Sequence, residues 1–589
     1  MNMGKKTNVA LDYRKKDRKK VIKTIVQFAI LLIVGTLLYQ AVFQVTSYAE
    51  PDHKSWTNEK GFIALSYFGV GRTGTSKLIA KNQLDEQLQA LHDQGYVTVS
   101  QQDILDYYNK KKPLPDKALF LSFEDGRNDS ALFADPILEK YNYKATALSY
   151  ANKVGNSDNK FLQPADMLKM IKTGFWELGS NGYRLTYINV FDRNGQFIGV
   201  RNENQLPNKE NIEYYNHYLM DFIRDSNMIP VEDRTEMEAR ITSDYKAMKD
   251  IYTKELGFVP GVYMIMHANT LYEGMNRLVS QVNDNNIRQI FNMHFNREGN
   301  VYNDQSAGLY NLTRVQPASY WYTNHLLMKI QKDTGQKMKF VRGDEDLFDQ
   351  WQKLSGAAQF TENKIALTSP PAESGMLYLK NSEGNRDVQV SAQLDGNLVG
   401  RQTIYVRYDR KTDAFVRVTL EDNKLIVEQK KPGGQVQELY SGKLSDVKWE
   451  SEDLAFNKAS VYTKAQTQAG APDEEEEFPT NIKNTRQMEI TMKGGSLRVV
   501  VDQKPVLDNT AIDPAIGQGG VALEAQYSKK NKKDDIYDGV FTDVKVASVG
   551  EKETDQTVLF TNSYTGFQGA ISRVENAISA SIDWVIDTF

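Results

Sequence analysis

Two adjacent carboxylates, Glu124 and Asp125, follow an apolar run that begins at Ala118, and they precede Gly126. A short buried strand that ends in acidic residues places charge at the carboxyl edge of a sheet, where α/β folds carry their chemistry. Neighbouring strand residues point to opposite sides, so we expect Glu124 and Asp125 to have different roles. A solvated turn after a buried strand is the alternative without chemistry.

Two histidines could complete a site with these carboxylates. His267 and His294 each follow an apolar run, at 261–266 and 287–293. If both lie above the same strand ends as Asp125, the group could bind a divalent metal ion or act in acid–base catalysis, because neutral imidazole and carboxylate suit such metals. The alternative is that each histidine is a hydrogen-bonded structural residue.

A second carboxylate pair points to a different chemistry. We expect Glu124 and Glu177 both to end strands, and a retaining glycosidase needs two carboxyl groups about 5 to 5.5 Å apart. The sequence does not give the distance between them, and Glu177 could equally orient the loop that follows it.

Strand and helix patterns alternate from residue 61 and would position these side chains. Leu84, Leu88 and Leu91 recur at helical spacing between two apolar strand patterns, and the order strand then helix repeats afterwards. Such alternation predicts an α/β domain in which successive strands run parallel. The predicted strands are 62–67, 96–99, 118–123 and 145–150.

The order of these segments resembles that of the polysaccharide deacetylases, the family 4 carbohydrate esterases with a NodB homology domain. The resemblance covers about residues 61–330, and we place the domain at 61–343. It implies a distorted (β/α) barrel with a divalent metal at the carboxyl ends of its strands, most similar to members that trim exopolysaccharides such as poly-N-acetylglucosamine. The segments that carry it are 63–67, 88–99, 121–126, 136–141 and 144–146.

The resemblance also implies roles for particular residues. Glu124 stands at the general-base position, normally an aspartate, and Asp125 at the first metal-ligand position. The two histidines of the second motif fall on Asn181 and Leu185. Leucine cannot bind a metal, and an asparagine oxygen is a weak, neutral ligand. We therefore expect the metal site to be lost or weakened and no cofactor to be required; an active barrel would need zinc or another divalent metal.

Further residues are candidates for glycan contacts or for a rebuilt site. Arg314 lies in the segment 312–315, which resembles the last strand of the family's barrel, and Tyr67 ends the first predicted strand. Glu177, His267 and His294 remain in the same group. The long segment 187–255 is rich in aromatic residues and would form either a helical insertion with its own small core or an aromatic, sugar-stacking rim over the barrel mouth.

The N-terminus predicts a membrane anchor. Residues 24–49 carry no charge and are long enough to cross a hydrocarbon core of roughly 30 Å. The tail 1–23 is basic, so we expect it in the cytoplasm and the bulk of the protein outside the cell. A cleaved signal peptide is the alternative. The net charge of −4 gives no reason to expect nucleic acid as a partner, and the absence of cysteine excludes disulfides and thiol chemistry.

The C-terminal half has a different pattern. Residues 344–364 are charged and helix-like and are predicted to be a linker, whereas 365–550 alternate with a period of two, which predicts a β-sandwich. Its strand order resembles the laminin-G or concanavalin-like jelly rolls, which often accompany carbohydrate-active domains. The segment 551–589 is expected to contain an amphipathic helix.

These features together predict a single-pass cell-membrane protein that acts on or binds an extracellular polysaccharide. The leading interpretation is a degenerate deacetylase-like barrel with little metal-dependent deacetylation, acting on an exopolysaccharide or cell-wall glycan. One alternative is an active N-deacetylase, or another glycan hydrolase, with a rebuilt site. The other is a scaffold in an exopolysaccharide synthesis or export complex, with those proteins as partners.

Overall fold

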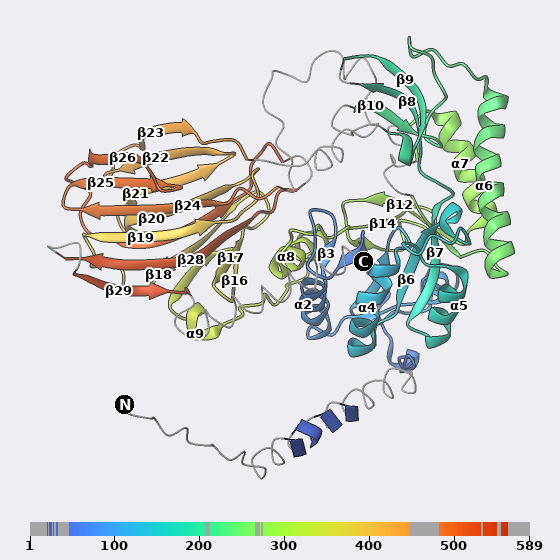
Figure 1. Ribbon diagram of the computed structural model, residues 1–589, viewed down its shortest axis with the longest axis horizontal. Coiled ribbons are helices and arrows are strands. Elements are labelled where there is room, and N and C mark those ends of the chain that lie inside the picture. Colours follow the sequence, from blue (N-terminus) through green and yellow to red (C-terminus); the bar gives the residue numbers. More distant parts are fainter. Residues whose placement is uncertain are drawn as a thin grey trace, which may run out of the picture.

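The computed structural model describes residues 46–563 except 193, 207–211, 266–270, 273–274, 448–481, 532–533 and 551–554, together with some residues between 20 and 32. It contains a barrel and a two-sheet β-sandwich that lie side by side (Figure 1). Most of the expected membrane helix at 24–49 and the expected amphipathic helix lie outside the described residues. Within the described ranges, no helix has the length and apolarity needed to cross a membrane.

Seven parallel strands form the barrel, in the order β1-β5-β6-β7-β11-β12-β14. The edge strands approach each other through Val315, which donates its N–H to the carbonyl of Ala64 and accepts from the N–H of Ser66. A distorted, nearly closed barrel results, as expected. The strands are β1 (Phe62–Tyr67), β5 (Ala118–Phe123), β6 (Ala145–Tyr150), β7 (Trp176–Gly182), β11 (Val262–Met264), β12 (Met293–Glu298) and β14 (Leu312–Arg314), with β4 (Val97–Thr98) beside β5 and β13 (Tyr302–Asn303) beside β1.

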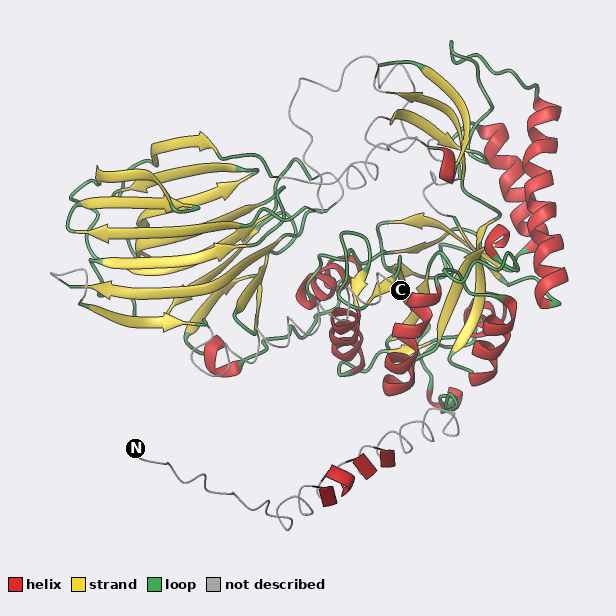
Figure 2. Ribbon diagram, viewed as in Figure 1, coloured by secondary structure: helices red, strands yellow, loops and turns green. Residues whose placement is uncertain are grey.

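Helices cover the outside of the barrel (Figure 2). Two of them begin at capping boxes, in which Ser100 and Asp233 accept the N–H three residues later, so these helix starts are set by local sequence. The helices are α2 (Lys81–His92), α3 (Gln101–Lys110), α4 (Asn128–Tyr141), α5 (Pro164–Thr173), α6 (Arg234–Leu256), α7 (Arg277–Ile290) and α8 (Thr323–Thr334).

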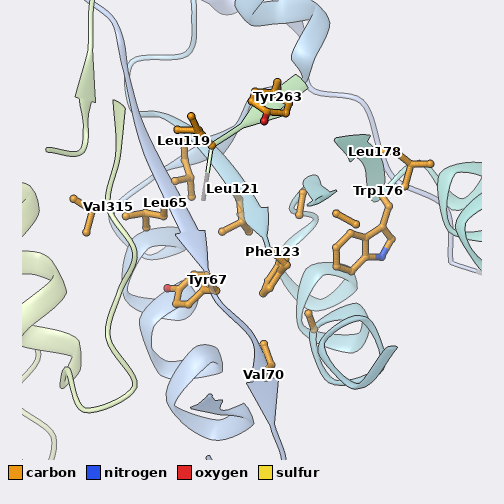
Figure 3. Close-up of a cluster of buried hydrophobic side chains, with 14 of the residues drawn as sticks. Leu65, Tyr67, Val70, Leu119, Leu121, Phe123, Trp176, Leu178, Tyr263 and Val315 are labelled. Carbon is orange, nitrogen blue, oxygen red and sulfur yellow. The ribbon is translucent and has the colours of Figure 1, made fainter. Parts of the chain in front are cut away.

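Successive side chains of each barrel strand point to opposite faces of the sheet, so they belong to two different hydrophobic cores. Leu65, Leu121 and Phe123 belong to the cluster between the strands and the helices (Figure 3). Ala64 and Phe120 point the other way and pack inside the barrel with Met264 and Phe295. The side of the sheet to which a residue points therefore decides whether it can reach the barrel interior.

The long segment after β7 has a small core of its own, as one of the two interpretations expected, but that core is built on strands and not on helices. It forms a three-stranded sheet of β8 (Thr186–Asp192), β9 (Phe197–Asn202) and β10 (Ile212–His217), in the order β10-β8-β9. Leu185 and Tyr215 pack with Tyr187, Val190 and Ile212 in that core. A two-stranded ribbon of β2 (Val70–Gly71) and β3 (Ile79–Ala80) follows β1.

The β-sandwich consists of two antiparallel sheets whose inner faces share one core. The predicted linker at 344–364 is wrong in detail, because sandwich strands already occupy most of it from Trp351 onward, and Trp351 itself is 2% exposed. The first sheet holds β15 (Trp351–Ser355), β18 (Ser374–Leu379), β27 (Gly520–Gln526), β20 (Arg401–Asp409), β21 (Ala414–Glu421), β22 (Lys424–Lys430) and β23 (Gln437–Lys443). The second holds β16 (Ala357–Thr361), β17 (Lys364–Thr368), β28 (Asp538–Val549), β19 (Val388–Leu394), β24 (Arg486–Lys493), β25 (Ser496–Val501), β26 (Lys504–Ala511) and β29 (Gln556–Thr561).

A buried ionic cluster joins the two domains. His325 of α8 lies between two sandwich carboxylates, 2.8 Å from Asp534 and 3.0 Å from Asp538. Its ring stacks on Trp321 at 4.3 Å between centroids. Burial alone would lower the pKa of His325, but the two carboxylates outweigh burial and raise it to about 9. The imidazolium therefore holds the barrel to the sandwich at neutral pH.

Candidate functional site

Glu124 lies at the centre of the candidate site, at the carboxyl end of β5 and inside the barrel. Its side chain is fully buried, and both of its oxygens accept hydrogen bonds. The Ser66 hydroxyl donates to Oε1 at 2.7 Å, and the Gln316 amide donates to Oε2 at 2.7 Å. Ser122 in turn donates to Ser66 at 2.8 Å, so a chain of hydroxyl groups leads to the carboxylate. Glu124 is therefore held by two donors, one from β1 and one from the loop after β14.

Arg314 and Glu124 face each other inside the barrel. The Nε atom of Arg314 lies 3.9 Å from Oε1 of Glu124, and the side chain is 3% exposed. Its Nη2 atom donates to the carbonyl of Ile265 at 3.0 Å. This buried cation balances part of the cost of burying the carboxylate.

Asp125 leaves the strand in a left-handed conformation, with φ of 69°. Its backbone N–H donates to Oδ1 of Asn181 at 3.0 Å, and the Asn181 amide donates to the carbonyl of Met264 at 3.2 Å. Asn181 thus ties the ends of β5 and β11 together from its place on β7. Its oxygen, which is the atom that could bind a metal, is used for the backbone of Asp125.

Leu185, at the position where the resemblance implies the second histidine, packs among the apolar side chains of the insertion. It offers no donor atom. Among the residues that the structure describes, no group of three His, Asp, Glu or Cys side chains could hold a metal ion. Asp125, Asn181 and Leu185 therefore do not fit the ligand set that the deacetylase resemblance implies.

His294 is not at the strand ends, contrary to the expectation from the sequence. It is the second residue of β12, and its neighbour Phe295 points into the barrel, so its own ring points outward. There it lies 5.2 Å from the ring of Tyr263, between centroids. Burial, Arg314 and Arg288 lower the pKa of His294 to about 3. His294 is a neutral core residue, and His267 lies outside the described residues.

Glu177 does not pair with Glu124, so the arrangement that a retaining glycosidase needs is absent at this pair of residues. It is the second residue of β7 and not the last, which puts it at the amino end of that strand. Its Oε2 atom accepts the backbone N–H of Gln101 at 2.8 Å, at the start of α3. Burial, the largest effect, raises the pKa of Glu177 to about 7. Its role is to cap α3.

Tyr67 is also placed outside the site. Its ring belongs to the core between strands and helices (Figure 3), and its hydroxyl donates to Oε1 of Gln87 in α2 at 2.8 Å. The alternation along β1 predicts this, because Ser66 occupies the inward position next to it.

Sequence reasoning missed Ser66, Gln316 and Tyr150 at the site. Ser66 and Tyr150 stand at inward positions of β1 and β6, so counting positions from Glu124 across the sheet could have found them. The Tyr150 hydroxyl is buried and has no hydrogen-bond partner among the described residues. Burial and then Asp125 raise the pKa of Tyr150. Gln316 lies in a loop that gives no such signal.

The site holds two carboxyl groups of weakened acidity. Burial raises the pKa of Glu124 to about 7, opposed by Arg314 and by the Ser66 hydrogen bond. Burial and then Glu203 raise the pKa of Asp125 to about 6, opposed by Arg127 and by two lysines. A carboxyl group with a pKa near neutrality suits proton transfer, but Glu124 has no exposed surface through which to meet a substrate.

The barrel is similar in sequence to polysaccharide deacetylases. Over 179 residues, 27% of this chain, it is 26% identical to a poly-beta-1,6-N-acetyl-D-glucosamine N-deacetylase of Staphylococcus aureus strain MRSA252, of which it covers 60%. Over 150 residues, 24% of this chain, it is 28% identical to the protein of the same name from Escherichia coli O157:H7, of which it covers 22%. The chain therefore spans less than two thirds of the length of either relative.

Solved structures with a similar arrangement include a de-N-acetylase from Aggregatibacter actinomycetemcomitans, with 20% sequence identity and a TM-score of 0.35. The match covers 45% of this chain and 98% of that one. No family model matches the chain.

Proposed function

We propose that this protein is a membrane-anchored, extracellular glycan-binding protein whose deacetylase-like barrel carries out little or no metal-dependent deacetylation. Its ligand would be an exopolysaccharide or cell-wall glycan, in keeping with the relatives named as poly-beta-1,6-N-acetyl-D-glucosamine N-deacetylases. The inherited metal site would be degenerate. The laminin-G-like sandwich would add a second surface for glycan or for a partner of the export system.

One observation carries this proposal. The Asn181 oxygen accepts the N–H of Asp125, and its amide donates to Met264, so both ends of this side chain are used inside the protein. A metal-binding histidine at this position could not use its ligand nitrogen both for the metal and for the N–H of Asp125. Leu185 removes the second nitrogen ligand altogether.

The burial and the hydrogen bonds of Glu124 support the same proposal. In a deacetylase the base must reach the water that attacks the acetyl group, within hydrogen-bond distance. Here both Glu124 oxygens are occupied by Ser66 and Gln316, and the side chain has no exposed surface. Its pKa of about 7 reflects burial in this network.

The test is to purify the full chain in detergent and to measure three quantities on one preparation: bound divalent metal, acetate release from N-acetylglucosamine oligomers, and affinity for the same oligomers. We expect no stoichiometric metal, no acetate above background, and measurable affinity. Asp125→Ala is the matched variant and should leave acetate release at background.

Two outcomes would replace the proposal with another. Bound zinc together with acetate release that Asp125→Ala abolishes would establish an active N-deacetylase with a rebuilt site. No metal, no acetate and no affinity for any oligomer would favour a scaffold role in exopolysaccharide synthesis or export.

A further inference from the structure

The chain that leaves the expected membrane segment is fixed to one end of the barrel. Tyr48 donates its N–H to the carbonyl of Thr173 at 2.9 Å, and its ring meets the ring of Phe175 edge-on at 5.6 Å. Ala49 exchanges two hydrogen bonds with the Asn142 side chain, at 2.9 and 2.7 Å. Asn142 and Thr173 end α4 and α5, just before β6 and β7, so residues 48–49 lie at the amino ends of the strands.

Glu50 strengthens this attachment. The attachment lies at the end of the barrel opposite its mouth, which is the end formed by the carboxyl ends of the strands. Its carboxylate pairs with Lys144 at 2.8 Å, and the same lysine lies 4.3 Å from the centre of the Tyr48 ring. Glu124 and Asp125 follow the carboxyl end of β5, on the other end of the barrel. In Figure 1 the chain accordingly enters the barrel from below, while the inserted sheet of β8, β9 and β10 lies above.

The lengths of chain fit a short connection to a bilayer. Residues 24–45 carry no charge and as a helix would extend ~33 Å, enough for a hydrocarbon core of roughly 30 Å. Two residues then separate residue 45 from Tyr48, and they reach at most ~10 Å when extended. A barrel anchored in this way has its amino-end face next to the lipid headgroups.

The charge of this face complements an anionic surface. Each of the seven barrel helices ends with a basic residue in its last turn, from His92 of α2 to Lys332 of α8, and all these ends lie on the amino-end face. Favourable interaction with the helix dipoles accounts for those residues. It does not account for the exposed loop lysines Lys60, Lys337 and Lys339, for which no ion-pair partner is found in the described ranges.

The same face also carries exposed carboxylates, Asp52, Glu59, Asp93 and Asp116. At the end of α3, Lys110 and Lys112 both pair with Asp106, at 2.9 and 2.6 Å. The exposed Lys54, Lys111 and Lys172 on this face, like Lys60, Lys337 and Lys339, have no ion-pair partner among the described residues. A lysine or arginine near an anionic membrane contributes about 1 kcal/mol of attraction, so a modest excess is enough to orient a domain that is already tethered.

We propose that the amino-end face of the barrel docks on anionic lipid headgroups and turns the mouth with Glu124 and Asp125 away from the membrane. This inference rests on the proposed membrane anchor. A strand of six residues spans ~17 Å, so the mouth would lie about that far above the face that contacts the lipid. It would open away from the membrane, on the side from which an extracellular polymer arrives.

Because the chain contains no cysteine, single introduced cysteines give unique labels for the test. Lys172→Cys places a fluorophore in the last turn of α5, on the amino-end face. Leu132→Cys is the matched position, 66% exposed near the start of α4 at the mouth. The full chain is reconstituted in phosphatidylglycerol vesicles that contain headgroup spin-labelled lipid. We expect the label at 172 to be quenched and the label at 132 to keep its intensity.

Flotation of the same vesicles distinguishes failure of the membrane anchor from failure of the docking. A chain that does not float overturns the membrane anchor and the docking together. A chain that floats with both labels equally quenched, or with the label at 132 quenched more, overturns the docking alone.

A charge-reversal variant tests the lipid chemistry. Lys60→Glu with Lys337→Glu should lose quenching at 172 in phosphatidylglycerol. The control Lys424→Glu with Lys504→Glu changes the same charge on exposed sandwich lysines and should retain it. Retained quenching in both variants would overturn the role of the lysines.

Discussion

At the scale of single residues, the site is defined by how Asn181 is used. Asn181 connects the backbone of Asp125 to that of Met264, at the position where the resemblance to deacetylases implies a metal-binding histidine. The two hydrogen bonds of Asn181 therefore form a structural clamp between the ends of β5 and β11.

Asn181→Ala tests the clamp. It leaves the Asp125 N–H and the Met264 carbonyl buried without this partner, and an unsatisfied buried group costs about 1 to 3 kcal/mol. We expect the free energy of unfolding of the barrel to fall by about 2 kcal/mol in urea titrations. The exposed Asn109→Ala serves as control and should change it little; equal effects in the two variants would contradict the clamp.

The carboxyl group of Glu124 predicts a pH dependence. Its pKa is about 7 in the folded protein and near 4.5 when unfolded, so the folded state binds the extra proton between these values. The stability that this group contributes is full below about pH 4.5 and is lost as the pH rises towards 7. Glu124→Gln keeps the shape and removes the titration.

We therefore expect wild type to lose stability relative to Glu124→Gln as the pH rises from 4.5 to 7, by on the order of 2 kcal/mol. Urea unfolding of both proteins at several pH values measures this difference. A difference that stays constant with pH would show that Glu124 is ionised throughout.

At the scale of elements, the turn after β5 depends on a glycine. Gly126 has φ of 59°, and a Cβ atom there would lie 2.8 Å from the Cβ of Ser149. Packing of β6 against this turn leaves no room for a side chain, so the turn that carries both carboxylates is fixed by the neighbouring strand.

Gly126→Ala should therefore lower the free energy of unfolding by more than the strain of a left-handed alanine alone. The conformation costs about 1 to 2 kcal/mol for alanine, and the overpacking adds about 1 to 3 kcal/mol. Gly95→Ala is a close control, because Gly95 has φ of 83° but nothing within 4 Å of its Cβ position. We expect a larger loss of unfolding free energy for Gly126→Ala; equal losses would mean that β6 can move.

At the scale of the whole molecule, His325 determines how the barrel and the sandwich are joined. It is 1% exposed, and its two ring nitrogens contact Asp534 and Asp538. Because the folded pKa of about 9 exceeds the ordinary 6.5, the stability it contributes is full below pH 6.5 and is lost as the pH rises through 9.

His325→Ala should weaken the junction by about 3 kcal/mol, because it leaves two buried carboxylates without their cation. We expect proteolysis between the domains to be faster in this variant at pH 7, and in wild type to accelerate between pH 6.5 and 9. Lys332→Ala, which removes an exposed pair with Asp535, is the control and should have little effect. If His325→Ala is cleaved between the domains no faster than wild type, the ionic junction is contradicted.

The site could be predicted from the sequence only in part. Glu124, Asp125 and Arg314 were placed at the strand ends from their apolar flanks and from the family resemblance, and the structure brings Glu124 and Arg314 together. Glu177, His294 and Tyr67 were misplaced, because position relative to a strand's start and the face to which a residue points depend on strand boundaries that shift by one or two residues.

The alternation of strand and helix and the change to a period of two after the barrel are predictable from the sequence, because they depend on residue type and local spacing. The sequence also shows Asn181 and Leu185 at the positions where the resemblance implies histidines. Three contacts follow only from the folded arrangement: Asn181 clamps Asp125, Ser66 and Gln316 occupy both oxygens of Glu124, and His325 joins the domains. Those contacts link residues 56 to 213 positions apart in the chain, and only packing brings such residues together.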